Sequence, residues 1–186
     1  SDFFSKNNLN KPFFIYSSSI IPDNEMLFYC LGSSLISIDR MTGNTLWEYP
    51  LPEMPDEYYL GSERRIVIHD ASIIIAGLHI IEAINKKTGE KVWTSEINEP
   101  DLEIYTSNPV VYNDNIIIGG GIGDGDWEDG GPVSWINYYL VVIDAITGKL
   151  IYTKDLDFGI EGNPSILGNK LYCWWTDSLI EISLSF

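Results

Sequence analysis

Carboxylates are the most abundant chemically active side chains in this sequence. The 186-residue chain carries 27 acidic and 11 basic residues, so its net charge is −16. Four acids lie close together in a glycine-rich stretch, at Asp124, Asp126, Glu128 and Asp129. Such oxygen-rich loops can bind Ca²⁺, but an EF-hand would need a Glu where Trp135 stands, and flanking helices. We expect no metal site here, with a weak calcium loop as the alternative.

Other catalytic patterns are missing from the sequence. It contains no GxSxG or HExxH motif, and no pair of carboxylates has a spacing that singles it out for acid/base catalysis. His69 and His79 lie near opposite ends of one predicted hairpin arm, where they would not share a metal or form a dyad. We therefore expect a protein that is not an enzyme and holds no cofactor.

The overall composition narrows the class of protein. Hydrophobic residues make up 45% of the chain, enough for a folded core. The acidic balance argues against nucleic-acid binding, which needs clustered Lys and Arg, and no apolar run is long enough to span a membrane. Cys30 and Cys173 form no metal-binding cluster, so we interpret them as buried thiols, although one disulfide is an alternative.

One pattern occurs three times and organises the chain. Thr-Gly pairs stand at positions 42, 88 and 147, separated by 46 and 59 residues. Each pair follows an alternating apolar segment that ends in Asp39, Asn85 or Asp144, and precedes an aromatic residue. A glycine turn between two apolar segments predicts a β-hairpin, and a second hairpin precedes each one. A period of this length is typical of a β-propeller blade.

We therefore predict an all-β fold, a four-bladed β-propeller with four-stranded antiparallel blades, as one domain over residues 1–186. The blades cover about residues 19–50, 65–98, 108–157 and 163–186. The last blade lacks a fourth strand, and an open sheet edge promotes aggregation. We predict that the N-terminal strand, residues 1–8, closes this edge.

The segments SIDRMTGNTLW, EAINKKTGEKVW and VIDAITGKLIY resemble the PQQ-like repeat. This repeat builds the propellers of quinoprotein dehydrogenases and of the lipoprotein that assists outer-membrane β-barrel assembly. The resemblance implies the propeller fold. The dehydrogenases of the family have eight blades and use adjacent cysteines, a calcium site and an Asp base beside the quinone. This chain has no adjacent cysteines, so the resemblance implies no quinone chemistry here.

The predicted blades place most acidic residues at one end of the propeller. In a four-stranded meander, the second loop of each blade and the links between blades lie at the same end. These segments hold sixteen acidic residues and Lys154 as their one basic residue. The third blade is also 13 residues longer than the second, and such insertions often carry a binding site.

We predict a partner-binding surface at this acidic end. It consists of acidic and aromatic residues of the insertion and of the first two links: Asp124, Asp126, Trp127, Glu128, Asp129, Trp135, Glu53, Asp56, Glu57, Tyr58, Tyr59, Glu99, Asp101, Glu103 and Tyr105. Negative potential speeds the association of a cationic partner, and exposed Trp residues often anchor interfaces. The alternatives are that the acidic loops serve solubility and that the two Trp side chains fold back as a local core.

The leading hypothesis is a non-catalytic protein-binding propeller that is a monomer when free and cytoplasmic. Its partner would be a basic protein, as for an immunity protein that neutralises a cationic bacterial toxin such as a nuclease. The alternative is an extracytoplasmic scaffold or ligand-binding propeller resembling the assembly lipoprotein, for which a signal peptide or lipid anchor upstream of Ser1 would be expected.

Overall fold

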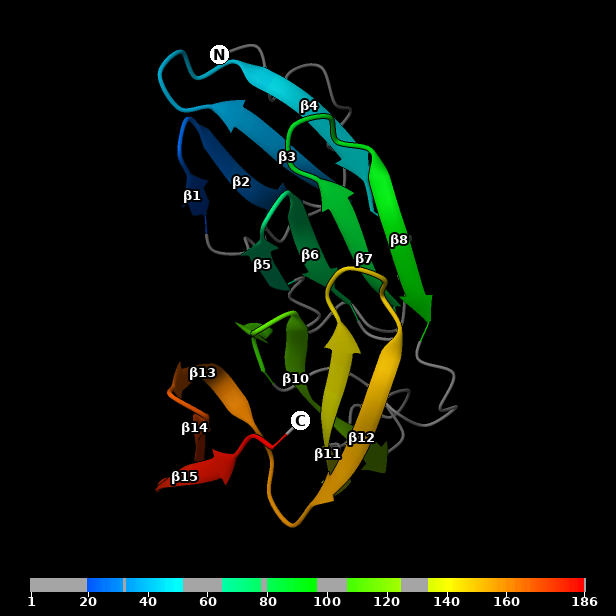
Figure 1. Ribbon diagram of the computed structural model, residues 1–186, viewed down its shortest axis with the longest axis vertical. Coiled ribbons are helices and arrows are strands. Elements are labelled where there is room, and N and C mark those ends of the chain that lie inside the picture. Colours follow the sequence, from blue (N-terminus) through cyan, green and yellow to red (C-terminus); the bar gives the residue numbers. More distant parts are fainter. Residues whose placement is uncertain are drawn as a thin grey trace.

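The structure is a computed structural model that describes residues 20–31, 33–51, 65–77, 80–96, 107–124 and 134–185. These residues form fifteen β-strands in four sheets. Every sheet is an antiparallel meander, in which each strand pairs with the next along the chain. The predicted all-β class and its four blade-like sheets are confirmed (Figure 1). None of the described segments forms a helix that is long and apolar enough to cross a membrane.

The strand bounds follow the predicted repeat. Blade 1 contains β1 (Ile21–Asp23), β2 (Met26–Leu31), β3 (Ser34–Asp39) and β4 (Thr45–Pro50); blade 2 contains β5 (Arg65–His69), β6 (Ser72–Ala76), β7 (Ile80–Asn85) and β8 (Lys91–Glu96). Blade 3 contains β9 (Val110–Tyr112), β10 (Asn115–Asp124), β11 (Ser134–Asp144) and β12 (Leu150–Leu156). Blade 4 has three described strands, β13 (Glu161–Leu167), β14 (Lys170–Trp175) and β15 (Ser178–Ser183).

The Thr-Gly turn joins the last two strands of blades 1 to 3 in the same way each time. Oδ1 of Asp144 accepts hydrogen bonds from the backbone N–H groups of Ile146 and Thr147, at 3.0 and 2.7 Å. Gly148 then adopts a φ of 73°, which side-chain-bearing residues rarely adopt. Asp39 and Asn85 accept the corresponding bonds in the other two blades. This local chemistry explains why the motif recurs.

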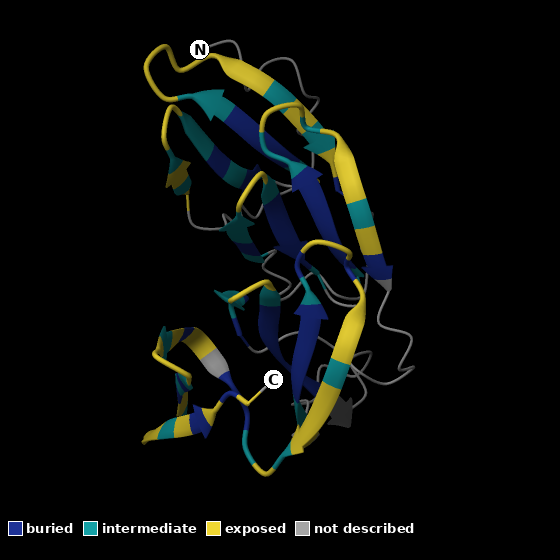
Figure 2. Cartoon of the chain, viewed as in Figure 1, coloured by how far each residue is buried: buried dark blue, intermediate teal, exposed yellow. Residues whose placement is uncertain are grey.

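Three apolar clusters hold the four blades together. The first joins blades 1 and 2 and includes Phe28 and Ile73; the second joins blades 2 and 3 and includes Ile74 and Ile116. The third joins blades 3 and 4. The middle strands are therefore buried, whereas the outer strands β4, β8 and β12 are largely exposed (Figure 2). Cys30 and Cys173 are buried in the first and third clusters, so they lie in different interfaces.

The blades follow one another along an arc, with blades 1 and 4 at its two ends (Figure 1). The first strands of the blades lie on the inner side of the arc and the fourth strands on the outer side. The predicted closing strand, residues 1–8, is outside the described residues, so closure by this strand stays a prediction.

Candidate functional site

The two ends of each blade carry different loops, as predicted. Backbone hydrogen bonds join the first turn of a blade to its Thr-Gly turn: Lys86 N–H donates to the carbonyl of Ala71 at 2.9 Å, and Ala145 N–H donates to that of Asp114 at 2.8 Å. Both turns therefore lie at one end of the blade. The strand ends that lead into the second loops and into the links between blades lie at the other end, which we call the acidic end.

The two long strands of the blade 3 hairpin, β10 and β11, extend towards the acidic end. Strands β10 and β11 stay paired as far as Asp124, which lies opposite Ser134, and Trp135 lies opposite Gly123. A register shift between Ile122 and Gly123 marks an irregularity in the ladder. Two predicted surface residues, Asp124 and Trp135, are thus placed at the far end of this hairpin.

The remaining residues of the predicted surface are outside the described residues: Asp126, Trp127, Glu128, Asp129, Glu53, Asp56, Glu57, Tyr58, Tyr59, Glu99, Asp101, Glu103 and Tyr105. Their role in partner binding stays a prediction.

Exposed carboxylates of the third link extend the acidic end. Asp155 lies on β12 opposite Tyr139, and Asp157 follows the strand; both side chains are exposed. Tyr138 lies on the neighbouring strand β11, opposite Leu156. Strand β12 pairs with β11 of the long hairpin, so Asp155 and Asp157 lie towards the same end of the blade as Asp124. Both residues belong to the sixteen acidic residues predicted at this end, but not to the predicted binding surface.

Close packing holds this link against blade 4. The ring of Tyr138 meets that of Trp175 edge to face, with centroids 4.6 Å apart. Both rings surround Gly159, where a methyl group would lie 2.4 Å from the Trp175 ring. The next residue, Ile160, is buried against Gly119. The packing of Gly159 and Ile160 between blades 3 and 4 therefore fixes the backbone position of the nearby Asp157.

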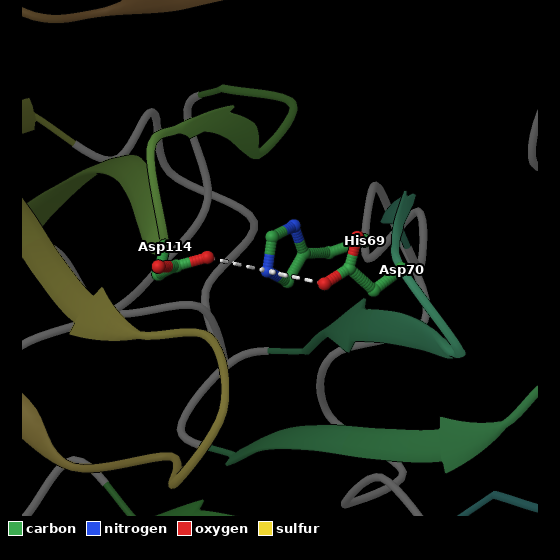
Figure 3. Close-up of side chains that lie close together, drawn as sticks. All are labelled: His69, Asp70 and Asp114. Atoms are coloured by element: carbon green, nitrogen blue, oxygen red, sulfur yellow. Dashed lines mark ion pairs between the residues drawn. The ribbon is translucent and has the colours of Figure 1, made fainter.

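A second group of polar side chains lies at the opposite end, between blades 2 and 3. Nε2 of His69 is 3.3 Å from Oδ1 of Asp114 and 3.9 Å from Oδ2 of Asp70 (Figure 3). The imidazole is largely buried, whereas both carboxylates are exposed. An imidazole nitrogen and two carboxylate oxygens are donor types that bind divalent cations.

Sequence reasoning missed this grouping because it tested His69 only against His79, which is outside the described residues. The signal was present in the repeat itself. His69 and Asp70 lie at the first turn of blade 2, and Asp114 lies at the first turn of blade 3. Neighbouring blades bring equivalent turns together, so a register comparison of the two turns would have found the group.

Sequence reasoning also passed over Glu82, a buried carboxylate between blades 1 and 2. It is 4% exposed and accepts hydrogen bonds from Tyr49 Oη and Thr94 Oγ1, both at 3.1 Å. Nζ of Lys91 lies 3.6 Å away. Burial, with the nearby Glu82 charge and hydrogen bond, raises the pKa of Tyr49 to about 12. These contacts join two blades by a polar link inside an apolar interface.

Solved structures with the same fold include enzymes and designed proteins. The quinohemoprotein alcohol dehydrogenase of Pseudomonas putida HK5 is similar over 84% of this chain and 28% of its own, with 16% identity and a TM-score of 0.64. The computationally designed Ika4 protein matches over 95% of both chains, with 12% identity and a TM-score of 0.65. The designed Ika8 protein matches over 90% of this chain and 45% of its own, with 11% identity and a TM-score of 0.62.

These similarities correct one expectation. From the sequence we expected a protein that is not an enzyme, but the solved structures that share the fold include an alcohol dehydrogenase. The absence of familiar catalytic motifs was therefore no ground for excluding an enzyme, because a propeller can position reactive groups from loops far apart in sequence. This chain spans less than a third of the dehydrogenase.

Sequence comparison gives the family directly. No curated protein matches the chain. The family model described as outer membrane protein assembly factor BamB matches residues 19–127 and 78–183, two overlapping segments that together cover most of the chain. The matched segments contain all three Thr-Gly turns and the Trp residues that follow two of them. The chain therefore belongs to the PQQ-like propeller family of the outer membrane protein assembly factor BamB.

Proposed function

We propose that this propeller binds a basic protein through its acidic end. The observation that carries the proposal is the position of Asp155 and Asp157, both exposed at the end of blade 3 to which the long hairpin brings Asp124. Several carboxylates on one side of a fold create a negative potential that attracts cationic surfaces and speeds their association. Membership of a family named for protein assembly supports a role in protein binding in general.

The specific form that we propose is an inhibitor of a cationic toxin, such as a nuclease whose substrate site attracts phosphate. The net charge of −16 supports this form, since an acidic surface can occupy a site built for a polyanion. The inhibitor would bind the toxin tightly at low salt and block its substrate site.

An affinity capture with matched variants tests partner binding. Asp155→Lys combined with Asp157→Lys reverses two charges at the acidic end. Glu25→Lys combined with Glu90→Lys makes the same change in net charge with two exposed residues at the opposite end. We expect the wild type and the Glu25/Glu90 variant to capture the same basic protein, and the Asp155/Asp157 variant to bind it with an association rate about tenfold lower.

Two outcomes would contradict the proposal. Equal association rates for the two double variants would show that the acidic end has no special role. A captured partner whose binding does not weaken between 0.05 and about 0.5 M salt would exclude electrostatic attraction as the driving force. Inhibition of the captured protein's own activity by the wild-type propeller is the readout for the toxin-inhibitor form.

The family favours a second candidate function, a scaffold in the assembly of envelope proteins. The match to the assembly-factor model over residues 19–183 is the observation that supports it. The same capture experiment distinguishes the two. A scaffold would retain envelope assembly proteins and would not inhibit any activity of its partner.

A further inference from the structure

The blade arc has two end faces that no other described blade covers. Four blades are held by three apolar clusters, between blades 1 and 2, 2 and 3, and 3 and 4. A closed ring of four blades needs a fourth interface, between blades 4 and 1. None of the clusters in the described part of the chain joins these two blades.

Blade 1 has apolar residues on the side that faces away from blade 2. We define its end face as Leu27, Tyr29, Leu31, Ile36 and Ile38. Leu27 pairs with Ile38, and Tyr29 with Ile36, across strands β2 and β3. Their side chains alternate with those of Phe28 and Leu35, which belong to the cluster shared with blade 2. Ile36, at the centre of the end face, is 4% exposed, and the four residues around it are partly buried. The end face is therefore a continuous apolar surface on two strands.

The repeat shows what normally covers this surface. Ile73 and Ile84 pair at the corresponding positions of blade 2, and Ile116 and Ile143 pair at those of blade 3. All four are fully buried, in the clusters that they share with the preceding blade. Leu27 and Ile38 are only partly buried. Blade 1 thus has the side chains of an inner blade and lacks a preceding blade in the described structure.

The Thr-Gly turn of blade 1 points to the same gap. In blades 2 and 3 the indole of the preceding blade packs on this glycine: Trp47 on Gly89 and Trp93 on Gly148. Gly43 is the corresponding residue of blade 1. Apart from its two chain neighbours, no described residue has an atom within 4 Å of the place that a Cβ would take there.

Blade 4 has the complementary end face, on the side that faces away from blade 3. We define it as Lys170, Tyr172, Trp174, Leu179 and Glu181. Trp174 and Leu179 are cross-strand partners and are 58% and 59% exposed. Their neighbours Cys173 and Ile180 point the other way, into the cluster with blade 3. Two large exposed apolar side chains side by side are typical of an interaction surface.

The geometry of the arc indicates what covers both faces. Blades 1 and 4 lie at opposite ends of the arc (Figure 1), so one described copy does not bring its own end faces together. A second copy has the same two faces at the ends of its own arc, so its blade 4 can meet blade 1 of the first copy.

We propose that two copies of this chain close one eight-bladed ring. Blade 4 of each copy packs against blade 1 of the other, so that Trp174 and Leu179 of one copy cover Leu27 and Ile38 of its partner. The same contact forms twice around a two-fold axis, which closes the assembly at two copies and leaves no end face for further growth.

The contact between two copies and the binding of a basic partner should depend on salt concentration in opposite ways. Each copy carries a charge of −16, so the two copies repel each other, and their contact is mainly apolar. Added salt screens the repulsion and should strengthen the dimer. The proposed binding of a basic protein weakens under the same conditions, so the two proposals fail separately.

Sedimentation equilibrium over a concentration series tests the proposal. We expect twice the chain mass of 21.0 kDa, with a dissociation constant that falls as salt rises. Leu179→Lys and Ile38→Glu each damage both contacts of the ring and should raise that constant at least about tenfold. Val92→Lys is the matched control, because Val92 is similarly exposed (52%) and lies on β8, away from both end faces.

Mixing the two variants tests the ring itself. A mixed pair of the Leu179→Lys and Ile38→Glu chains has two different contacts. In one contact neither residue is changed, and in the other the new Lys at position 179 meets the new Glu at position 38. We expect the mixture to form dimers where each variant alone is monomeric, which also shows that both variants are folded. A wild type that stays monomeric at all concentrations and salts would overturn the proposal in favour of closure within one chain. Failure of the mixture to dimerise would exclude the head-to-tail contact.

Discussion

The indole of Trp93 packs directly on Gly148 of the next blade. A methyl group at Gly148 would lie 2.5 Å from Cε3 of the Trp93 ring, and the indole Nε1 donates a hydrogen bond to the carbonyl of Ala145 at 3.1 Å. Trp47 makes the equivalent contacts with Gly89 and with the carbonyl of Lys86. The Thr-Gly pair and the Trp that follows it therefore serve two purposes. They form the turn within a blade, and they make the contact between neighbouring blades.

Gly148→Ala should lower the free energy of unfolding by about 2–4 kcal/mol. The added methyl group meets the Trp93 ring, and the φ of 73° is unfavourable for alanine. Gly43→Ala is the matched control, because its φ is 72° but nothing lies within 4 Å. Gly43→Ala should lower the free energy of unfolding by about 1 kcal/mol, because only the unfavourable φ of alanine contributes. Urea unfolding of both variants checks the difference, and equal losses would contradict a role for the Trp contact.

Alkaline pH should destabilise the protein through Tyr49. Its pKa is raised to about 12 in the folded protein, whereas a tyrosine in an unfolded chain has a pKa of about 10. The unfolded state therefore loses this proton first. The contribution of the protonated Tyr49 to the free energy of unfolding is fully present below pH 10 and is lost as the pH rises towards 12. Tyr49→Phe should remove this part of the pH dependence. Thermal unfolding from pH 9 to 12 tests it, and an unchanged pH dependence in the variant would contradict it.

Acid should weaken the Thr-Gly turns of blades 1 and 3. Backbone hydrogen bonds, above all from Thr42 and Thr147, hold the pKa of Asp39 and Asp144 below the usual value. Their stabilisation is complete above the unfolded pKa of about 3.9 and is lost as the pH falls through the lower folded pKa.

Asp39→Asn combined with Asp144→Asn should remove this acid dependence and keep the fold. Asn85 shows that an amide oxygen accepts the same two backbone bonds. Unfolding of the double variant between pH 2 and 5 is the measurement. A loss of stability on acidification as steep as in the wild type would show that other carboxylates dominate.

The ion pair between Asp23 and Lys86 should stabilise the contact of blades 1 and 2. Nζ and Oδ2 are 2.7 Å apart, and the two side chains are 16% and 19% exposed, with Lys86 the less exposed. A double-mutant cycle with Asp23→Asn and Lys86→Met should give a coupling of about 1 kcal/mol. The more exposed pair Lys170–Glu181 serves as comparison and should couple less. Equal couplings would contradict the importance of burial.

The sequence predicted the blades because their information is local. A strand of alternating apolar residues, an Asp or Asn that accepts two backbone bonds, and a glycine with positive φ lie within about ten residues of one another, as at Asp144 and Gly148. Such signals repeat along the chain and specify each hairpin without help from the rest of the fold. The order of strands and the separation of loops into two ends follow from the meander alone.

Contacts between blades were beyond the sequence because they join residues far apart in the chain. The repeat aligns the two turns that carry His69 and Asp114, but it does not give the 3.3 Å distance between these side chains. Glu82 sits within an apolar strand, and its partner Tyr49 is 33 residues away. The rotation between neighbouring blades decides such meetings. That rotation depends on how side chains such as Trp47 and Trp93 fill each interface. The repeat alone therefore determined the blades, and only the tertiary structure decided how they curve into an arc and that Trp174 and Leu179 stay exposed at one of its ends.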